Sequence, residues 1–201
     1  MVTNIYFIRH AQPNLDNHDD FQRELSDKGL QDCQLLTQYF KQIPIHAILS
    51  SPYKRAYDTL KPLAKNKHLS IQTDSRFRER KITSEWIKDF DTFAQKQWAD
   101  FSYHLPAGES LQDVQIRMLD GLTEALHTYP DKTIVIGSHG TAISSLIHYF
   151  YPDFGYRDFF LLKDTMPFIL KLECQGRHCL SIDLYNVFTE QSFTYFSNKA
   201  D

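Results

Sequence analysis

Arginine and histidine side chains follow three apolar runs of the sequence. Arg9 and His10 come directly after the first run, Arg55 lies shortly after the second, and His139 comes directly after the third. Guanidinium groups form paired hydrogen bonds with the oxygens of a phosphoryl group. A neutral imidazole is a competent nucleophile, with an ordinary pKa of about 6.5. These residue types together suit the binding of a phosphorylated ligand and attack on its phosphorus.

The three runs have the composition of strands buried in a sheet. They cover residues 5–8, 46–50 and 133–138, and a helical pattern of apolar residues follows each of them. This alternation is typical of an α/β fold. In an open α/β sheet, ligands bind outside the carboxyl ends of the strands, so we expect the arginines and histidines to face one crevice.

Two helix starts are predicted beside these side chains. Ser51 is expected to cap a helix with Pro52 in its first position, which places Arg55 in the first turn. Gly140 would let the backbone approach a ligand closely where the helix after His139 begins. Helix N-termini bind anions through unpaired N–H groups. Taken alone, Arg55 also fits a solvated surface residue, but its place after a strand favours an anion site.

A carboxylate and an aromatic segment lie between the second and third runs. Glu79 follows a weaker strand pattern at 70–73 and is the candidate acid for a leaving oxygen. The segment at about 80–107 predicts a helical lid insertion. We expect its aromatic face to pack on the core, with a lid that touches substrate as the alternative. The aromatic residues are Trp86, Phe90, Phe93, Trp98 and Phe101.

The last part of the chain predicts two more strands, at 168–172 and 180–187, joined by a turn. Cys174, His178 and Cys179 lie around that turn and are potential metal ligands. They lack a second ligand pair at zinc-site spacing, so we interpret them as part of a hairpin and expect no metal.

Composition limits the classes of partner. The chain has 201 residues, 42% of them hydrophobic, and a formal net charge of −3. This suits one α/β domain over 1–201 and argues against nucleic acid or an acidic membrane surface as partner, because both require a basic field. With no apolar run near the ~20 residues of a membrane span and no signal peptide, we expect a cytoplasmic protein with reduced cysteines.

Five motifs, in order, resemble those of the histidine phosphatase superfamily, also called phosphoglycerate-mutase-like. They are 8–12 (IRHAQ), 25–29 (LSDKG), 50–56 (SSPYKRA), 108–110 (GES) and 138–140 (SHG). The resemblance spans the chain. It implies a three-layer α/β fold with a mixed, mainly parallel sheet between helices, and activity without metal or cofactor.

The resemblance also implies roles for individual residues. His10 would be transiently phosphorylated, Arg9, Arg55, His139 and Gly140 would bind phosphate, and Glu79 would donate the proton. Many members carry a phosphate-contacting asparagine where this chain has Asp16; Asn14 or Asn17 could replace it. The chain also lacks the His-Tyr-Gly of the mutases and the Gly-x-Trp-Glu-Gly of the phosphatases after its Glu79.

We therefore expect a metal-independent phosphatase that hydrolyses a small phosphorylated metabolite through a phosphohistidine. One alternative is a phosphoglycerate-type mutase, and another is a catalytically silent relative that only binds phosphorylated ligands, with Asp16 as its motivation. A metal-dependent hydrolase lacks a convincing ligand set. The sequence does not fix the substrate or the oligomeric state, for which a homodimer is one option.

Overall fold

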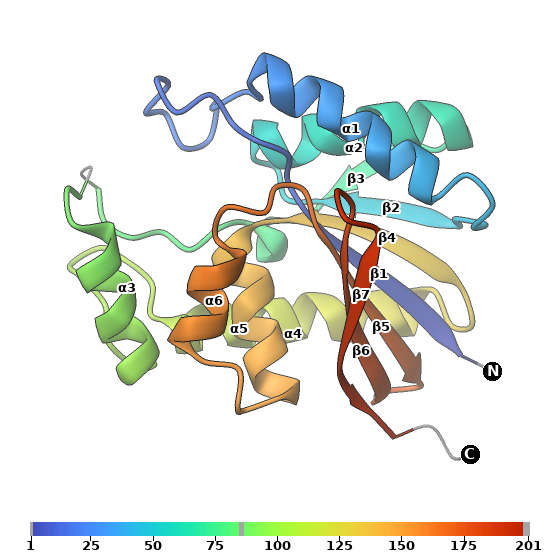
Figure 1. The fold of residues 1–201 in the computed structure, drawn as a ribbon. Helices are drawn as coiled ribbons and strands as arrows, with labels where there is room; N and C mark the ends of the chain where they lie inside the picture. Colours follow the sequence, from blue (N-terminus) through green and yellow to red (C-terminus); the bar gives the residue numbers. More distant parts are fainter. Residues whose placement is uncertain (1, 85–86, 199–201) are drawn as a thin grey trace.

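One seven-stranded sheet runs through the described residues of the structure, a computed structural model that covers 2–84 and 87–198 (Figure 1). The strand order is β3-β2-β4-β1-β5-β6-β7. Its parallel part comprises β1 (Thr3–Arg9), β2 (Ala47–Ser50), β3 (Ile71–Thr73) and β4 (Thr133–Ser138). Its antiparallel part comprises β5 (Ile169–Gln175), β6 (His178–Asn186) and β7 (Gln191–Ser197).

Helices cover both faces of the sheet. Figure 1 shows α1 (Asp27–Tyr39) and α2 (Lys54–Lys67) on one side. On the other side lie α4 (Leu111–Thr128), α5 (Gly140–Phe150) and α6 (Tyr156–Leu162), with α3 (Phe90–Ala99) beyond α6. The expected fold class, a three-layer α/β fold with a mixed sheet whose core is parallel, is confirmed.

The central strand β1 shows how the sequence produces these layers. Because side chains alternate along a strand, Ile5 and Phe7 enter the core under α4 and α5, whereas Tyr6 and Ile8 enter the core under α1 and α2. Ile5, Phe7 and Ile8 are completely buried. A strand with apolar residues on both faces therefore lies in the middle, and Arg9 and His10 stand at its carboxyl end.

Helix caps decide where two of the helices begin. Ser26 accepts a hydrogen bond from the backbone N–H of Gly29 at the start of α1, and Ser110 forms a capping box with Asp113 at the start of α4. The predicted cap of α2 is wrong. The helix begins at Lys54, and the hydroxyl of Ser51 lies against His139 instead.

The predicted lid segment packs largely on the core. Phe93 is buried, and Trp98 contacts the rings of Phe101 and Phe159. Phe90 is the exception because it also lines a cavity. Trp86 lies outside the described residues. The core-facing interpretation therefore holds for most of the aromatic face, and the substrate-facing alternative remains open for Phe90.

The sequence did not predict α6 or β7. The strands β5 and β6 form the expected hairpin, which places Cys174 opposite Cys179 and carries Gly176 in a left-handed turn with φ 58°. The thiols of the three cysteines are free. Among the described helices, none has both the length and the apolar character needed to cross a membrane.

Candidate active site

His10 lies at the carboxyl end of β1 and is 6% exposed. Its Nδ1 is 2.7 Å from the carbonyl oxygen of Ala11, which can only accept a hydrogen bond, so Nδ1 carries the ring proton and Nε2 keeps the lone pair. Burial, followed by the positive charges of Arg55 and Arg9, lowers the pKa of His10 well below its usual value. The imidazole is therefore neutral, with Nε2 available to attack.

Arg9 is the nearest cation along the chain. Its Nη1 donates to the carbonyl oxygens of Leu162, at 2.7 Å, and Thr165, at 3.1 Å. Its Nε is buried without a hydrogen-bond partner among the described residues. Burial lowers the pKa of Arg9 to about 10, so the side chain remains charged at neutral pH. Nε and Nη2 of the guanidinium group are thus left for a ligand.

Gly140 makes room for that arginine. A Cβ atom at position 140 would lie 3.0 Å from both Cζ and Nε of Arg9. Gly140 was expected to let the backbone approach a ligand, and the close approach that the structure records is that of the guanidinium group. A side chain at this position would displace Arg9.

His139 follows β4 and is completely buried. Its ring centroid lies 5.1 Å from that of His10, with the two rings edge to face. Nε2 is 2.8 Å from the hydroxyl of Ser51, and Nδ1 has no partner among the described residues. Burial, and then the charge of Arg55, lowers the pKa of His139 well below its usual value. A neutral ring that accepts from Ser51 at Nε2 would carry an unused N–H at Nδ1.

Arg55 lies in the first turn of α2 and is 3% exposed, which excludes a solvated surface residue. Its Nε donates to Nε2 of His10 at 3.2 Å. Its Nη1 donates to the carbonyl oxygen of Asp20, and its Nη2 is 3.0 Å from Oδ1 of the same residue. The guanidinium group stands over the ring of Tyr53. Arg55 therefore covers the lone pair on Nε2 of His10, and Asp20 holds the guanidinium group of Arg55 in this position.

The carboxylate of Glu79 lies at the N-terminus of α5. Its carboxylate accepts from the backbone N–H groups of Thr141, at 3.1 Å, and Ala142, at 3.2 Å, and from that of Arg80, at 2.8 Å. The first N–H groups of a helix have no partner within the helix, so a carboxylate binds there readily. The sequence predicted that the N-terminus of α5 binds a ligand, and in the structure the carboxylate of Glu79 occupies part of this helix end.

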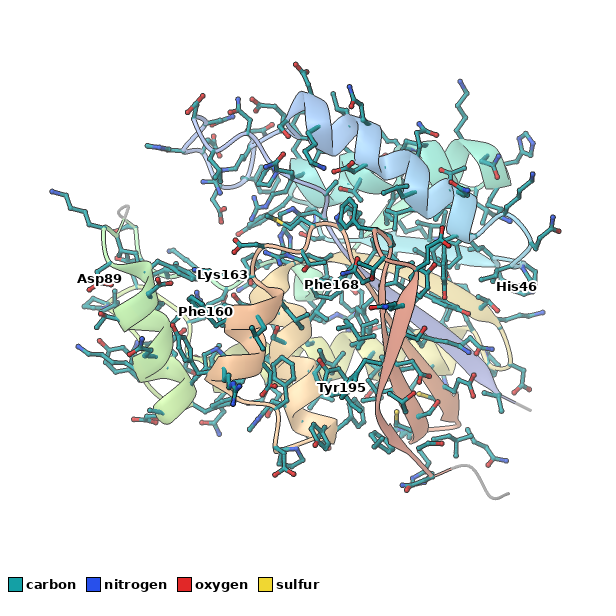
Figure 2. The ribbon with its side chains drawn as sticks, in the orientation of Figure 1. His46, Asp89, Phe160, Lys163, Phe168 and Tyr195 are labelled. Atoms are coloured by element: carbon teal, nitrogen blue, oxygen red, sulfur yellow. The ribbon has the colours of Figure 1, made fainter. Side chains whose placement is uncertain are left out.

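These side chains meet at a cavity of about 840 Å³. Arg9, His10, Arg55, Glu79 and Gly140 line it, whereas His139 lies behind His10. Most of the remaining lining comes from three segments, which are the loop 14–24, residues 80–84, 87 and 90, and the part of the chain from α6 to the loop after it. Pro13, Tyr53 and Thr141 complete the lining. Figure 2 shows Phe160 and Lys163 between α6 and α3, on the side where Asp89 begins the helix.

The loop 14–24 contributes two charged groups that the sequence did not single out. Arg23 is buried, donates from Nε to the carbonyl oxygen of Asn17 at 2.7 Å, and lines the cavity. Asp20 pairs with both Arg23 and Arg55. An irregular loop has no periodicity that indicates which side chains turn inward.

The residues at or near the position of the family's phosphate-contacting asparagine, which are Asn14, Asp16 and Asn17, lie outside the cavity. The amides of Asn14 and Asn17 each donate to a carboxylate oxygen of Glu24 at 2.7 Å, and Asp16 is exposed. None of these three residues lines the cavity. The carboxylate that meets Arg55 is that of Asp20.

Arg80 is another cavity residue that the sequence did not indicate. It is 3% exposed, lines the cavity, and stands over the rings of Phe90 and Phe93 at 5.6 and 5.0 Å. Its Nη1 donates to the side-chain oxygen of Gln97. Burial lowers the pKa of Arg80 to about 10. Arg80 lies in a run of charged residues at 78–81, and nothing in that pattern indicates that its side chain is buried.

The comparisons with known proteins agree with this geometry. A model of the histidine phosphatase superfamily (branch 1) matches residues 5–183. The chain belongs to the histidine phosphatase superfamily. The resemblance drawn from the five motifs is therefore confirmed.

Members of this superfamily that resemble the chain include phosphatases and mutases. The chain is 26% identical over 150 residues to the uncharacterized phosphatase PhoE of Bacillus subtilis, covering 73% of this chain and 76% of that protein. It is 24% identical over 155 residues to a probable phosphoglycerate mutase, GpmB, of Cronobacter sakazakii, covering 71% and 72%. The solved structure of a mycobacterial glucosyl-3-phosphoglycerate phosphatase superposes with a TM-score of 0.72 at 19% identity over both full chains.

Among residues 2–84 and 87–198, no group of three or more histidine, cysteine, aspartate or glutamate side chains is arranged to hold a metal ion. The arginine and lysine side chains that line the cavity are Arg9, Arg23, Arg55, Arg80, Lys81 and Lys163.

Proposed function

We propose that the protein is a metal-independent phosphatase that hydrolyses phosphomonoesters through a phosphohistidine at His10. The observation that carries this proposal is a buried guanidinium donor without a protein partner beside two buried imidazoles. Nε of Arg9 has no partner in the described part of the chain, and the rings of His10 and His139 lie edge to face with centroids 5.1 Å apart. A buried donor without a partner costs roughly 1–3 kcal/mol, so this site favours a ligand that accepts hydrogen bonds. A phosphoryl group supplies acceptors of the right charge.

The reaction would follow from these positions. Phosphate oxygens accept from Arg9, Arg55 and His139, and Arg55 turns away from Nε2 of His10 to reach them. Nε2 then attacks phosphorus, the bond to the ester oxygen breaks, and the electron pair goes to the departing oxygen. The positive charges stabilise the equatorial oxygens in the transition state.

Glu79 is the proposed proton donor for the departing alcohol. It lines the cavity next to Gly140 and Thr141, and this position supports the proposed role. After the alcohol leaves, the same carboxylate would take a proton from water. That water attacks the phosphohistidine and releases inorganic phosphate, which restores His10.

The test is to trap the intermediate. The protein is mixed briefly with a phosphomonoester labelled in its phosphoryl group and quenched in alkali, because phosphohistidine is destroyed by acid. We expect label on His10 and none in His10→Ala, while His104→Ala, which changes an exposed histidine outside the cavity, keeps the label. Label on a serine would overturn the proposal.

A mutase remains the second candidate because the chain resembles a probable phosphoglycerate mutase. With phosphoglycerate as substrate, a mutase yields the isomer and a phosphatase yields free phosphate, so the products distinguish the two. A silent phospholigand-binding relative would give neither product. Asp16 no longer supports that alternative, since its carboxylate does not line the cavity.

A further inference from the structure

Two large apolar side chains of the loop 14–24 are exposed in the cavity. The other residues of this loop are polar, and its only apolar members, Leu15 and Phe21, both line the cavity. Leu15 is 63% exposed and Phe21 is 48% exposed. Neither is needed to fill the core, and apolar surface left in water is unfavourable. Their common direction indicates that something apolar covers them.

Apolar side chains continue around the cavity from other parts of the chain. Ile82, Ile87 and Phe90 enter from the lid segment, and Phe159 and Met166 enter from α6 and the loop after it. The ring of Tyr53 contacts that of Phe21. We call these five side chains of the lid segment, α6 and the following loop, together with Leu15 and Phe21, the apolar wall. The apolar wall thus comes from separate segments and borders the proposed phosphate site.

Several charged groups of the cavity already have protein partners. Asp20 is paired with Arg55, Lys163 lies 3.7 Å from Asp91, and Arg80 is bonded to Gln97. The carboxylate of Asp19 accepts backbone N–H groups of its own loop. These groups have contacts without a ligand, whereas Leu15 and Phe21 remain in water. Among the large apolar side chains that line the cavity, Leu15 and Phe21 are the exposed ones.

We infer that the substrate is a phosphomonoester whose alcohol carries an apolar group, an alkyl chain or a ring, that lies against the apolar wall. This rests on the proposed function, because the phosphoryl group must occupy the site beside His10. Contact with Leu15, Phe21 and the lid side chains would then give binding energy at a distance from the reacting atoms. A compact polar alcohol, such as that of an amino acid or a small sugar, would leave the wall uncovered.

The test compares ethyl, butyl and hexyl phosphate. Chain lengthening hardly alters the chemistry at the ester oxygen, so differences in kcat/KM report contact with the protein. Each buried methylene should raise kcat/KM about two- to fourfold, so the four additional methylenes should make hexyl phosphate better than ethyl phosphate by about 16- to 250-fold. Equal kcat/KM along the series would overturn the inference and leave the phosphatase intact.

The double variant Leu15→Ser/Phe21→Ser locates the effect. The ratio of hexyl to ethyl phosphate should fall at least threefold relative to the wild type, since both side chains would lose apolar surface. Leu30→Ser removes an equally exposed leucine on α1 that is not part of the cavity, and it should keep the wild-type ratio. An unchanged ratio in the double variant would overturn the assignment of the wall. If the wild type released phosphate from none of the esters, nitrophenyl phosphate included, the proposed function would fall first.

Discussion

The phosphate site and the apolar wall are two parts of one cavity that the chain holds in different ways. The phosphate site, defined as Arg9, His10, Arg55 and His139, lies at strand ends and in a first helical turn, and all four side chains are buried or nearly so. The apolar wall comes mostly from loops, and Leu15 and Phe21 are largely exposed. A change at the phosphate site must disturb the sheet or the buried charges, whereas the wall can change alone. The proposed chemistry therefore depends on the fold, and the proposed substrate contacts depend on the loops.

The largest effect is expected at the nucleophile. His10→Ala removes the nitrogen that attacks phosphorus, so kcat should fall by about 10⁴-fold or more, as when other enzymes lose a nucleophile. Steady-state release of phosphate measures the loss. Circular dichroism should show an intact fold. Turnover at the wild-type rate would mean that the phosphate site is not where the chemistry happens.

Arg55→Ala should come next. The variant loses a cation that stabilises the transition state, which typically costs about 10²- to 10³-fold in rate. Arg157→Ala is the matched control because this arginine is exposed and lies outside the cavity, and its kcat/KM should be unchanged. Arg80 is unsuitable as a surface control, since it is buried. Small and equal losses in both variants would remove Arg55 from the phosphate site.

Glu79→Gln tests the boundary between the two parts. An alkyl alcohol is a poor leaving group and needs a proton, so its ester should react about 10²-fold more slowly or worse in the variant. Nitrophenyl phosphate needs little protonation and should lose less than about tenfold. Kinetics with both esters give the contrast. A uniform loss would instead assign Glu79 to holding the first turn of α5, where it bonds Thr141 and Ala142.

A smaller effect is expected from the loop. Asp20 is paired with Arg55 and its side chain is 47% exposed, so phosphate must displace a partly solvated ion pair of modest strength. Asp20→Asn should tighten product inhibition by phosphate about two- to fivefold. Asp16→Asn changes an exposed carboxylate outside the cavity and should leave the inhibition constant unaltered. Weaker inhibition in Asp20→Asn would show that Asp20 supports the phosphate site.

No effect is expected from removing metal ions. The arginines and the proposed N–H of His139 supply the positive groups that a metal would otherwise bring to the phosphate oxygens. Activity after dialysis against a strong chelator should equal that of the untreated protein. Loss of activity that added zinc or magnesium restores would contradict the proposed mechanism.

Sequence patterns predicted the phosphate site better than the wall for a physical reason. Arg9, His10 and His139 directly follow strands whose buried composition is unambiguous, and parallel strands bring their carboxyl ends together. The cap at Ser51 was wrong because α2 begins later, at Lys54; the hydroxyl of Ser51 accepts from the backbone N–H of Tyr53 before the helix and also lies 2.8 Å from Nε2 of the tertiary partner His139. No local pattern reports such a partner.

The residues that were missed lie where periodicity is weak. Asp20 and Arg23 belong to an irregular loop, and Arg80 is a charged residue whose burial depends on Phe90 and Phe93 from a later helix. The strand β7 has mostly exposed side chains, so it lacks the alternation that marks a half-buried strand. In each case the deciding contact is distant in sequence.

The central position of β1 determines how slowly its backbone amides exchange with solvent. β1 is bonded to β4 on one side and to β5 on the other, and the amide of His10 donates to the carbonyl oxygen of Ser138. Amides of such a strand exchange with solvent only through the largest openings of a protein, while loop amides exchange through small local ones. Deuterium should therefore enter the loop 14–24 long before it reaches β1. The backbone that carries His10 would stay ordered through fluctuations that repeatedly expose the apolar wall.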